Sequence, residues 1–225
     1  MGSDIDLSSA PRRAFLTHCI AAALLGWAAV PAAANTQGPK ARLLVLGDSL
    51  SAEYGLARGT GWVALLEQRL AREKLAWQVV NASISGETTS GGRSRLPALL
   101  QQHQPRVVII ELGGNDALRG LPLAMTQANL TEMARLAKAA GARVLVAGIT
   151  VPPNYGRAYG EGLLALFGTV AKAEGTALVP FLLSGVADAP NADDLFQPDR
   201  IHPKAEAQAR MLDNVWPILR PLLRP

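Results

Sequence analysis

The chain has 225 residues, of which 49% are hydrophobic, 18% are charged and 5% are aromatic, and its formal net charge is +4 at pH 7. This composition is typical of one globular domain that buries a sizeable core. The basic residues are scattered, without a run of five or six, and few aromatic residues are available as stacking platforms. The composition therefore argues against nucleic-acid binding.

The amino-terminal segment has the pattern of a secretory signal peptide. A pair of arginines at 12–13 precedes an uncharged stretch rich in Ala and Leu at 14–30. Three alanines at 32–34 then supply the small residues of a cleavage site before Asn35. This order of regions predicts that residues 1–34 are a signal peptide that is removed on export.

Two features of this segment leave alternatives open. The arginine pair resembles a twin-arginine signal, but Pro11 precedes it, so ordinary Sec export also fits. A retained membrane anchor is less favoured, because the apolar stretch is short and contains His18. Cys19 is the only cysteine and leaves with the signal, so the mature chain has no disulfide, thiolate metal site or cysteine nucleophile. We expect residues 35–225 to form one domain in the periplasm or outside the cell.

Strand-like and helix-like segments alternate along this domain. In chain order, strands are predicted at 43–46, 77–82, 107–112, 144–149 and 177–181. Helices are predicted at 62–72, 123–140, 163–173 and 203–216, and a further helix, between the second and third strands, ends with residues 96–103. Such alternation implies parallel strands, right-handed crossovers and helices on both faces. We therefore predict a three-layer α/β/α architecture, in which ligand-binding groups follow the carboxyl ends of strands.

The first predicted strand ends in Gly47-Asp48-Ser49, which places a small hydroxyl at that edge of the sheet. We expect Gly47 to allow a sharp turn, and Asp48 and Ser51 to form hydrogen bonds within the turn. A serine becomes a nucleophile only beside a base. A plain strand-to-helix turn with a capping serine is the alternative interpretation.

Hydrogen-bond donors follow the second and third predicted strands. Gly86 offers a main-chain amide, and Asn115, within the glycine-rich segment 113–116, offers a side-chain amide. With the amide of Ser49, they could stabilise one oxyanion. Taken singly, Gly86 fits a turn glycine and Asn115 a loop-stabilising asparagine equally well.

A candidate base and its partner precede the last predicted helix. His202 follows Asp199 by three residues, in a loop bounded by Pro198 and Pro203. Such a loop can bring the carboxylate to one ring nitrogen while the other faces a nucleophile. Alternatively, Asp199 caps the helix and His202 packs at its end. His103 ends a polar helix at the opposite edge of the sheet, so we interpret it as surface.

Together, these four segments resemble, in order, the four sequence blocks of the SGNH, or GDSL, hydrolases. The resemblance covers residues 42–216 and is greatest to the bacterial periplasmic thioesterase I, lysophospholipase L1 and arylesterase group. It implies a flavodoxin-like five-stranded parallel sheet in the order 2-1-3-4-5. It also implies that Ser49 is the nucleophile and first oxyanion donor, with Gly86 and Asn115 as the other donors. His202 would then be the base, and Asp199 the carboxylate that orients it.

The long loops after the strands give candidates for substrate binding, namely Tyr54, Pro152 and Tyr155. Arg200 stands where the group is expected to have glycine, and either favours anionic substrates or points outward. The departure leaves the substrate preference open.

These observations predict an exported esterase or thioesterase that acts through an acyl-serine intermediate. Its substrate would be a small-molecule or lipid acyl ester or thioester. We expect a monomer without cofactor or metal, and without stable membrane insertion of the mature chain. An acyltransferase or a carbohydrate deacetylase could use the same residues, and a non-catalytic periplasmic binding module is the alternative from another class.

Overall fold

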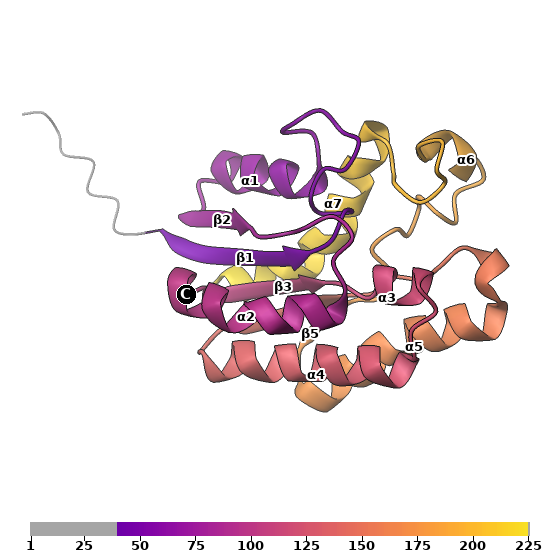
Figure 1. The fold of residues 1–225 in the computed structure, drawn as a ribbon. Helices are drawn as coiled ribbons and strands as arrows, with labels where there is room; N and C mark the ends of the chain where they lie inside the picture. Colours follow the sequence, from indigo (N-terminus) through magenta and orange to yellow (C-terminus); the bar gives the residue numbers. More distant parts are fainter. Residues whose placement is uncertain (1–39, 225) are drawn as a thin grey trace, which may run out of the picture. The chain divides into compact units, whose positions relative to one another are not determined.

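The computed structural model describes residues 40–224, and the predicted signal peptide at 1–34 lies outside the described residues. Strands and helices alternate along the described chain (Figure 1). The strands are β1 (Ala41–Gly47), β2 (Trp77–Asn81), β3 (Val107–Glu111), β4 (Arg143–Ala147) and β5 (Ala177–Val179). The helices are α1 (Trp62–Arg72), α2 (Thr89–His103), α3 (Gly114–Leu118), α4 (Leu123–Ala139), α5 (Arg157–Glu174), α6 (Ala192–Leu195) and α7 (Ala205–Leu219), with 3-10 turns at Pro153–Tyr155 and Arg220–Leu223.

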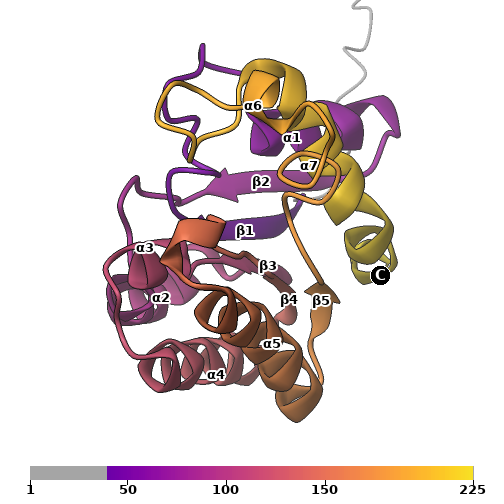
Figure 2. The same cartoon turned by 90° about the vertical axis from the view of Figure 1, so that its right-hand side faces the viewer.

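The five strands form one parallel sheet in the order β2-β1-β3-β4-β5, which confirms the predicted topology. Helices α1 and α7 pack together on one face, whereas α2, α4 and α5 cover the other (Figures 1 and 2). Strand β3 is buried along its whole length, as its continuous apolar sequence predicts. The molecule therefore has the predicted helix–sheet–helix layers.

The structure differs from the sequence prediction at two strand ends and in its helices. Strand β4 ends at Ala147 instead of 149, and β5 ends at Val179 instead of 181. Helix α5 begins at Arg157 instead of 163, because its first turns are rich in glycine and lack apolar periodicity. Helix α7 begins at Ala205 instead of 203, because Pro203 forms an isolated antiparallel bridge with Phe196. The short helices α3 and α6 were not predicted, since five and four residues are too few for a periodic pattern.

Strand register brings the candidate segments to one edge of the sheet. Gly47, the last residue of β1, lies beside Glu111, the last residue of β3. Beyond β2, the main-chain amide of Ile84 donates to the carbonyl of Gly47 at 3.0 Å. The segments that follow β1, β2 and β3 therefore leave the sheet side by side, on the side seen in Figure 2.

Gly148, directly after β4, offers a test of this packing. A Cβ added there would lie 2.3 Å from the main-chain carbonyl oxygen of Pro180, which a flexible side chain cannot relieve. We expect Gly148→Ala to lower the free energy of unfolding by about 1–3 kcal/mol. In the control Gly168→Ala, within α5, the added Cβ meets nothing within 4 Å, so helix propensity should raise stability by about 0.5–1 kcal/mol. Urea unfolding midpoints measure both, and equal midpoints for the two variants would contradict the close approach.

Candidate active site

The turn that carries Ser49 begins directly after β1. The carbonyl of Asp48 accepts hydrogen bonds from the amides of Ser51 and Ala52 at 3.2 and 3.0 Å, and its Oδ1 accepts one from the amide of Leu50 at 3.0 Å. The predicted bonding of the turn by Asp48 is thus present. Ser51 instead points beneath the turn, where its Oγ lies 2.6 Å from Oε2 of Glu111.

We expected Gly47 to be required for a sharp turn of the backbone, and this reason is wrong. Gly47 is the last residue of β1, and its φ is not positive. A Cβ added there would lie 2.8 Å from Oε2 of Glu111 and from the Cβ and Oγ of Ser51. Gly47 is therefore needed because Glu111 and Ser51 approach the backbone closely, and an unusual turn is not required.

The structure brings Ser49, His202 and Asp199 together from two distant parts of the chain. Nε2 of His202 lies 2.8 Å from Oγ of Ser49, and Nδ1 lies 2.7 Å from Oδ2 of Asp199. Ser49 and His202 are half-buried, and Asp199 is more exposed. A hydroxyl, an imidazole and a carboxylate are thus connected in series, which is the arrangement that activates a serine.

The loop before α7 holds Asp199 and His202 by its own hydrogen bonds. Oδ1 of Asp199 accepts from the main-chain amides of Ile201 and His202, both at 3.0 Å. The N-cap of α7 is Lys204, so the alternative in which Asp199 caps this helix is wrong. These bonds leave Oδ2 of Asp199 free to meet the imidazole.

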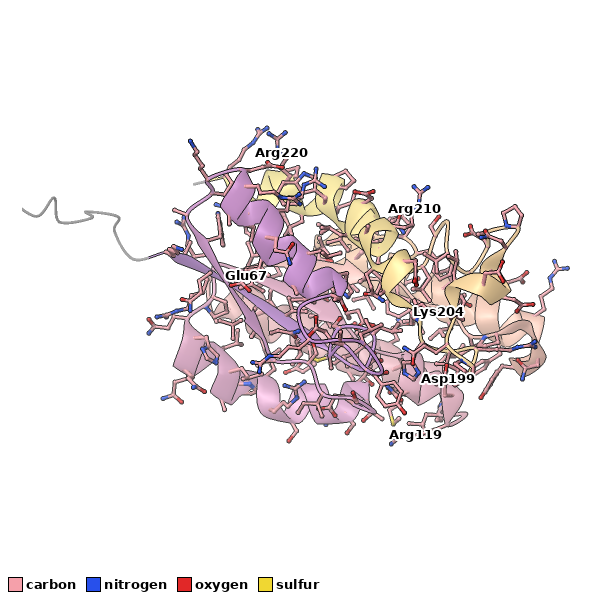
Figure 3. All side chains as sticks on the ribbon, turned by 90° about the horizontal axis from the view of Figure 1, so that it is seen from above. Glu67, Arg119, Asp199, Lys204, Arg210 and Arg220 are labelled. Carbon is pink, nitrogen blue, oxygen red and sulfur yellow. The ribbon has the colours of Figure 1, made fainter. Side chains whose placement is uncertain are left out.

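Arg200 adopts a φ of 58°, the left-handed conformation that glycine tolerates best. The loop makes a tight turn at Arg200 that requires this conformation. Glycine adopts it most easily, which explains why glycine is expected at this position. The side chain of Arg200 is exposed and lines an open surface hollow together with Lys204 and Asp193. Figure 3 shows Asp199, Lys204 and Arg119 toward the same end of the sheet, away from Arg220.

The three candidate oxyanion donors lie at this edge. Asn115 is in the first turn of α3, and its Nδ2 donates to Oδ2 of Asp48 at 3.0 Å. Gly86 has a φ of 80°, and its carbonyl accepts from Arg119 at the end of α3 at 2.9 Å. Within residues 40–224, the amides of Ser49 and Gly86 donate to no protein acceptor. All three donors therefore retain an N–H that could bind an oxyanion.

A narrow hollow, into which no water-sized sphere fits, borders Ser49 and His202. The ring of Tyr54 lies against the imidazole, with centroids 4.3 Å apart, and half of Tyr54 is exposed. The lining residues are Ser49, Leu50, Tyr54, Leu56, His202, Pro203 and Gln208. Pro152 and Tyr155 are not among them, so the structure brings only Tyr54 of the predicted substrate-binding residues to this hollow. The sequence did not predict that Leu56 and Gln208 line this hollow. An apolar residue in a polar loop, as Leu56 is, could have indicated a substrate-binding position.

His103 lies at the other edge of the sheet. It ends α2, and its carbonyl accepts from Arg42, near the start of β1, at 2.9 Å. Of the two histidines within residues 40–224, only His202 therefore reaches Ser49. Among residues 40–224, no group of three His, Cys, Asp or Glu side chains is placed to hold a metal ion. No helix within the same residues is both long and apolar enough to cross a membrane.

Two buried carboxyls lie beneath Ser49. Burial raises the pKa of Asp48 to about 6, although the hydrogen bonds from Leu50 and Asn115 partly offset it. Burial and the nearby charge of Asp48 raise the pKa of Glu111 well above its usual range. Partial burial also raises the pKa of Asp199, but the bonds from His202 and Ile201 outweigh it and hold this pKa below its usual value.

The raised pKa of Glu111 makes stability depend on pH. The unfolded chain releases this proton near pH ~4.3. Above that pH the folded state holds more protons than the unfolded state, so stability falls as pH rises, by at most ~1.4 kcal/mol per pH unit. Glu111→Gln cannot ionise, so its stability relative to the native chain should increase as the pH rises above ~4.3. Urea unfolding across this range measures the difference, with exposed Glu132→Gln as control. A difference that does not change with pH would contradict a buried, protonated Glu111.

Residues 45–210 match the family described as the GDSL-like lipase/acylhydrolase family. The chain is 52% identical over 212 residues to the protein named esterase TesA of Pseudomonas aeruginosa, covering 94% of this chain and all of that protein. It is 44% identical over 185 residues to the Escherichia coli protein named thioesterase 1/protease 1/lysophospholipase L1, covering 80% and 84% of the two chains.

Solved structures agree with this similarity. A crystal structure of TesA has a TM-score of 0.77 and 55% identity, over 80% of this chain and 99% of that chain. The psychrotrophic esterase EstA from Pseudoalteromonas sp., solved with the inhibitor monoethylphosphonate, has a TM-score of 0.75 and 39% identity, over 81% and 98%. With its sheet order, these similarities and a family match across most of its length, the chain belongs to the GDSL-like lipase/acylhydrolase family of ester hydrolases.

Proposed function

We propose that the chain is an exported serine esterase or thioesterase that hydrolyses acyl esters or thioesters through an acyl-serine intermediate. The observation that carries this proposal is the 2.8 Å contact between Ser49 and His202, continued by the 2.7 Å contact to Asp199. An acyltransferase would use the same three groups, but no feature of the described site favours an acceptor other than water.

In the first half of the reaction, Nε2 of His202 takes the Ser49 proton while Oγ attacks the substrate carbonyl carbon. The tetrahedral intermediate collapses, the bond to the leaving alcohol or thiol breaks, and His202 returns the proton to that leaving group. In the second half, His202 takes a proton from water as the water oxygen attacks the acyl carbon. When the bond to Ser49 breaks, His202 returns that proton to Oγ of Ser49, and the carboxylic acid leaves. Asp199 keeps the imidazole in the tautomer that accepts at Nε2 and stabilises its positive charge.

The negative charge that develops on the carbonyl oxygen needs donors that are already in place. We assign this role to the amides of Ser49 and Gly86 and to Nδ2 of Asn115. Each such donor contributes about 10²–10³ to turnover in comparable sites. Support comes from the unpartnered amides of Ser49 and Gly86 and from the position of Asn115 beside Asp48.

The hollow beside Ser49 favours an apolar group of the substrate. Leu50, Leu56 and the ring of Tyr54 line it, so the apolar part of an acyl ester would lie against these side chains. Ser49, His202 and Asp199 come from one chain, so the site is complete without a second copy. We therefore propose that the enzyme acts as a monomer on a small-molecule or lipid ester.

Ser49→Ala tests the nucleophile. Without Oγ no acyl-enzyme can form, so hydrolysis of p-nitrophenyl esters should fall to the background rate while the thermal unfolding temperature stays near that of the native chain. A fluorophosphonate should label the native chain at Ser49 and leave the variant unlabelled. Ser94→Ala, an exposed position on α2, serves as the matched control and should keep full activity. Hydrolysis by Ser49→Ala, or labelling of another residue, would overturn the assignment.

Export is tested by the mass of the mature protein. The signal pattern predicts that the full chain, expressed in a bacterium with a periplasm, is recovered there as a species that begins at Asn35. Substitution of both arginines at 12–13 by lysine should block export by the twin-arginine route and leave Sec export intact. A cytoplasmic protein, or a membrane-bound one that keeps residues 1–34, would contradict the proposal.

A further inference from the structure

Arg119 has no part in the reaction described above, yet it connects two segments that do. It directly follows α3, and its main-chain amide donates to the carbonyl of Asn115 at 3.2 Å. Its exposed side chain extends to the segment that follows β2, where Nη2 donates to the carbonyl of Gly86 at 2.9 Å. One residue therefore contacts the main chain of both assigned oxyanion donors that lie outside the Ser49 turn.

Gly86 occupies the third position of a four-residue turn. The amide of Glu87 donates to the carbonyl of Ile84 at 3.1 Å, and Gly86 has a φ of 80°, whereas the φ of Ser85 is not positive. These are the features of a type II turn. Type I and type II turns differ by a rotation of the central peptide, and glycine at the third position is compatible with both. The N–H of Gly86 belongs to that central peptide, so its direction depends on the contacts that hold the turn.

The guanidinium of Arg119 is the contact that holds this turn from outside. Within residues 40–224, the hydrogen bond that the Gly86 carbonyl accepts comes from Arg119. The neighbouring Glu87 does not draw the guanidinium away, because its own carboxylate lies 2.7 Å from Nε of Arg95. Arg119 therefore binds the main chain of the turn instead of forming an ion pair with it.

A buried link joins the same two segments further from solvent. The amide of Thr89, three residues beyond Gly86, donates to Oδ2 of Asp116 on α3 at 2.8 Å, and both residues are fully buried. Because Asp116 directly follows Asn115, this bond fixes the inner ends of the two segments. Arg119 fixes their exposed ends, so its removal should leave the fold intact and loosen only the turn at Gly86.

We propose that Arg119 is a positioning residue for catalysis, whose guanidinium holds the Gly86 turn against α3 so that the N–H groups of Gly86 and Asn115 converge on one oxyanion. This inference rests on the proposed function, since it assumes that both groups bind the oxyanion. Arg119 acts through Gly86 and is not itself assigned as a donor to the oxyanion. Its loss should therefore weaken binding of the transition state more than binding of the substrate.

Arg119→Met tests this role, because methionine keeps a long unbranched side chain but cannot donate to the carbonyl. Its kcat for a p-nitrophenyl ester should fall about 3–30-fold, with KM changed by less than about threefold. Labelling of Ser49 by a fluorophosphonate, whose phosphoryl oxygen would meet the same donors, should slow in parallel. Arg135→Met is the matched control: this exposed arginine of α4 donates to Glu174 at 3.0 Å, and its loss should change neither rate.

A second measurement does not depend on activity. NMR relaxation of the main-chain amide of Gly86 should show a lower order parameter in Arg119→Met than in the native chain, because the turn has lost its outer contact. Arg135→Met should leave this order parameter unchanged. Thermal unfolding of each variant shows whether the protein is folded at the assay temperature.

The outcomes separate failure of this inference from failure of the proposed function. If the native chain neither hydrolyses esters nor is labelled at Ser49, the proposed function is wrong. If the native chain is active but Arg119→Met has the same kcat, or is changed in KM alone, only the positioning role is overturned. A fall in kcat with an unchanged Gly86 amide would also overturn it, because Arg119 would then act through its charge and not through the turn.

Discussion

The parallel pairing of β1 with β3 ends where Gly47 lies beside Glu111, and the candidate site is assembled around that contact. The carboxyl of Glu111 turns back beneath β1, where one oxygen meets both the hydroxyl of Ser51 and, at 3.3 Å, the amide of Asp48. A side chain at position 47 would occupy the same space. The hydroxyl of Ser49 thus stands on a turn that a neighbouring strand holds from below, and its place is determined by sheet register more than by the loop itself.

The imidazole reaches Ser49 by a different physical route. Its loop closes on itself through the bridge between Phe196 and Pro203 and through the bond from the amide of Gln197 to the carbonyl of His202 at 2.8 Å. The side chain of Gln197 also donates to the carbonyl of Tyr54 at 2.9 Å, which links this loop to the one that follows Ser49. The two loops therefore form one unit, and the packing of Tyr54 on His202 follows from that link. Local hydrogen bonds therefore determine the position of His202, whereas sheet register determines the position of Ser49.

The strand order and the segments that form the candidate site could be predicted because both leave recognisable patterns in the sequence. The apolar run at 107–112 marks a buried strand, and the segments that follow strands meet at one edge of a parallel sheet. The sequence patterns do not predict helix α3 or the early start of α5, because these segments are too short or too rich in glycine to show periodicity. They do not predict the bridge at Pro203 because it is a contact between segments apart in the loop. The role of Gly47 was also misjudged, since only the packed structure reveals a close approach by Glu111. Pro152 and Tyr155 could not be placed because their loop has no periodic signal.

The buried acidic groups at this edge oppose folding, yet they are retained where the chemistry requires directed hydrogen bonds. Taking Asp48 and Glu111 out of water is costly, and the charge of Asp48 raises the cost of ionising Glu111 further. A hydrophobic pair of similar size would remove that cost, but it could not accept the amide of Leu50 and the side chain of Asn115. In the proposed function, this loss of stability keeps Ser49 and the assigned donors in place before substrate arrives, and such preorganisation gives fixed dipoles their effect on a developing charge. The candidate site therefore combines buried acidic groups with hydrogen bonds that give each of them a partner.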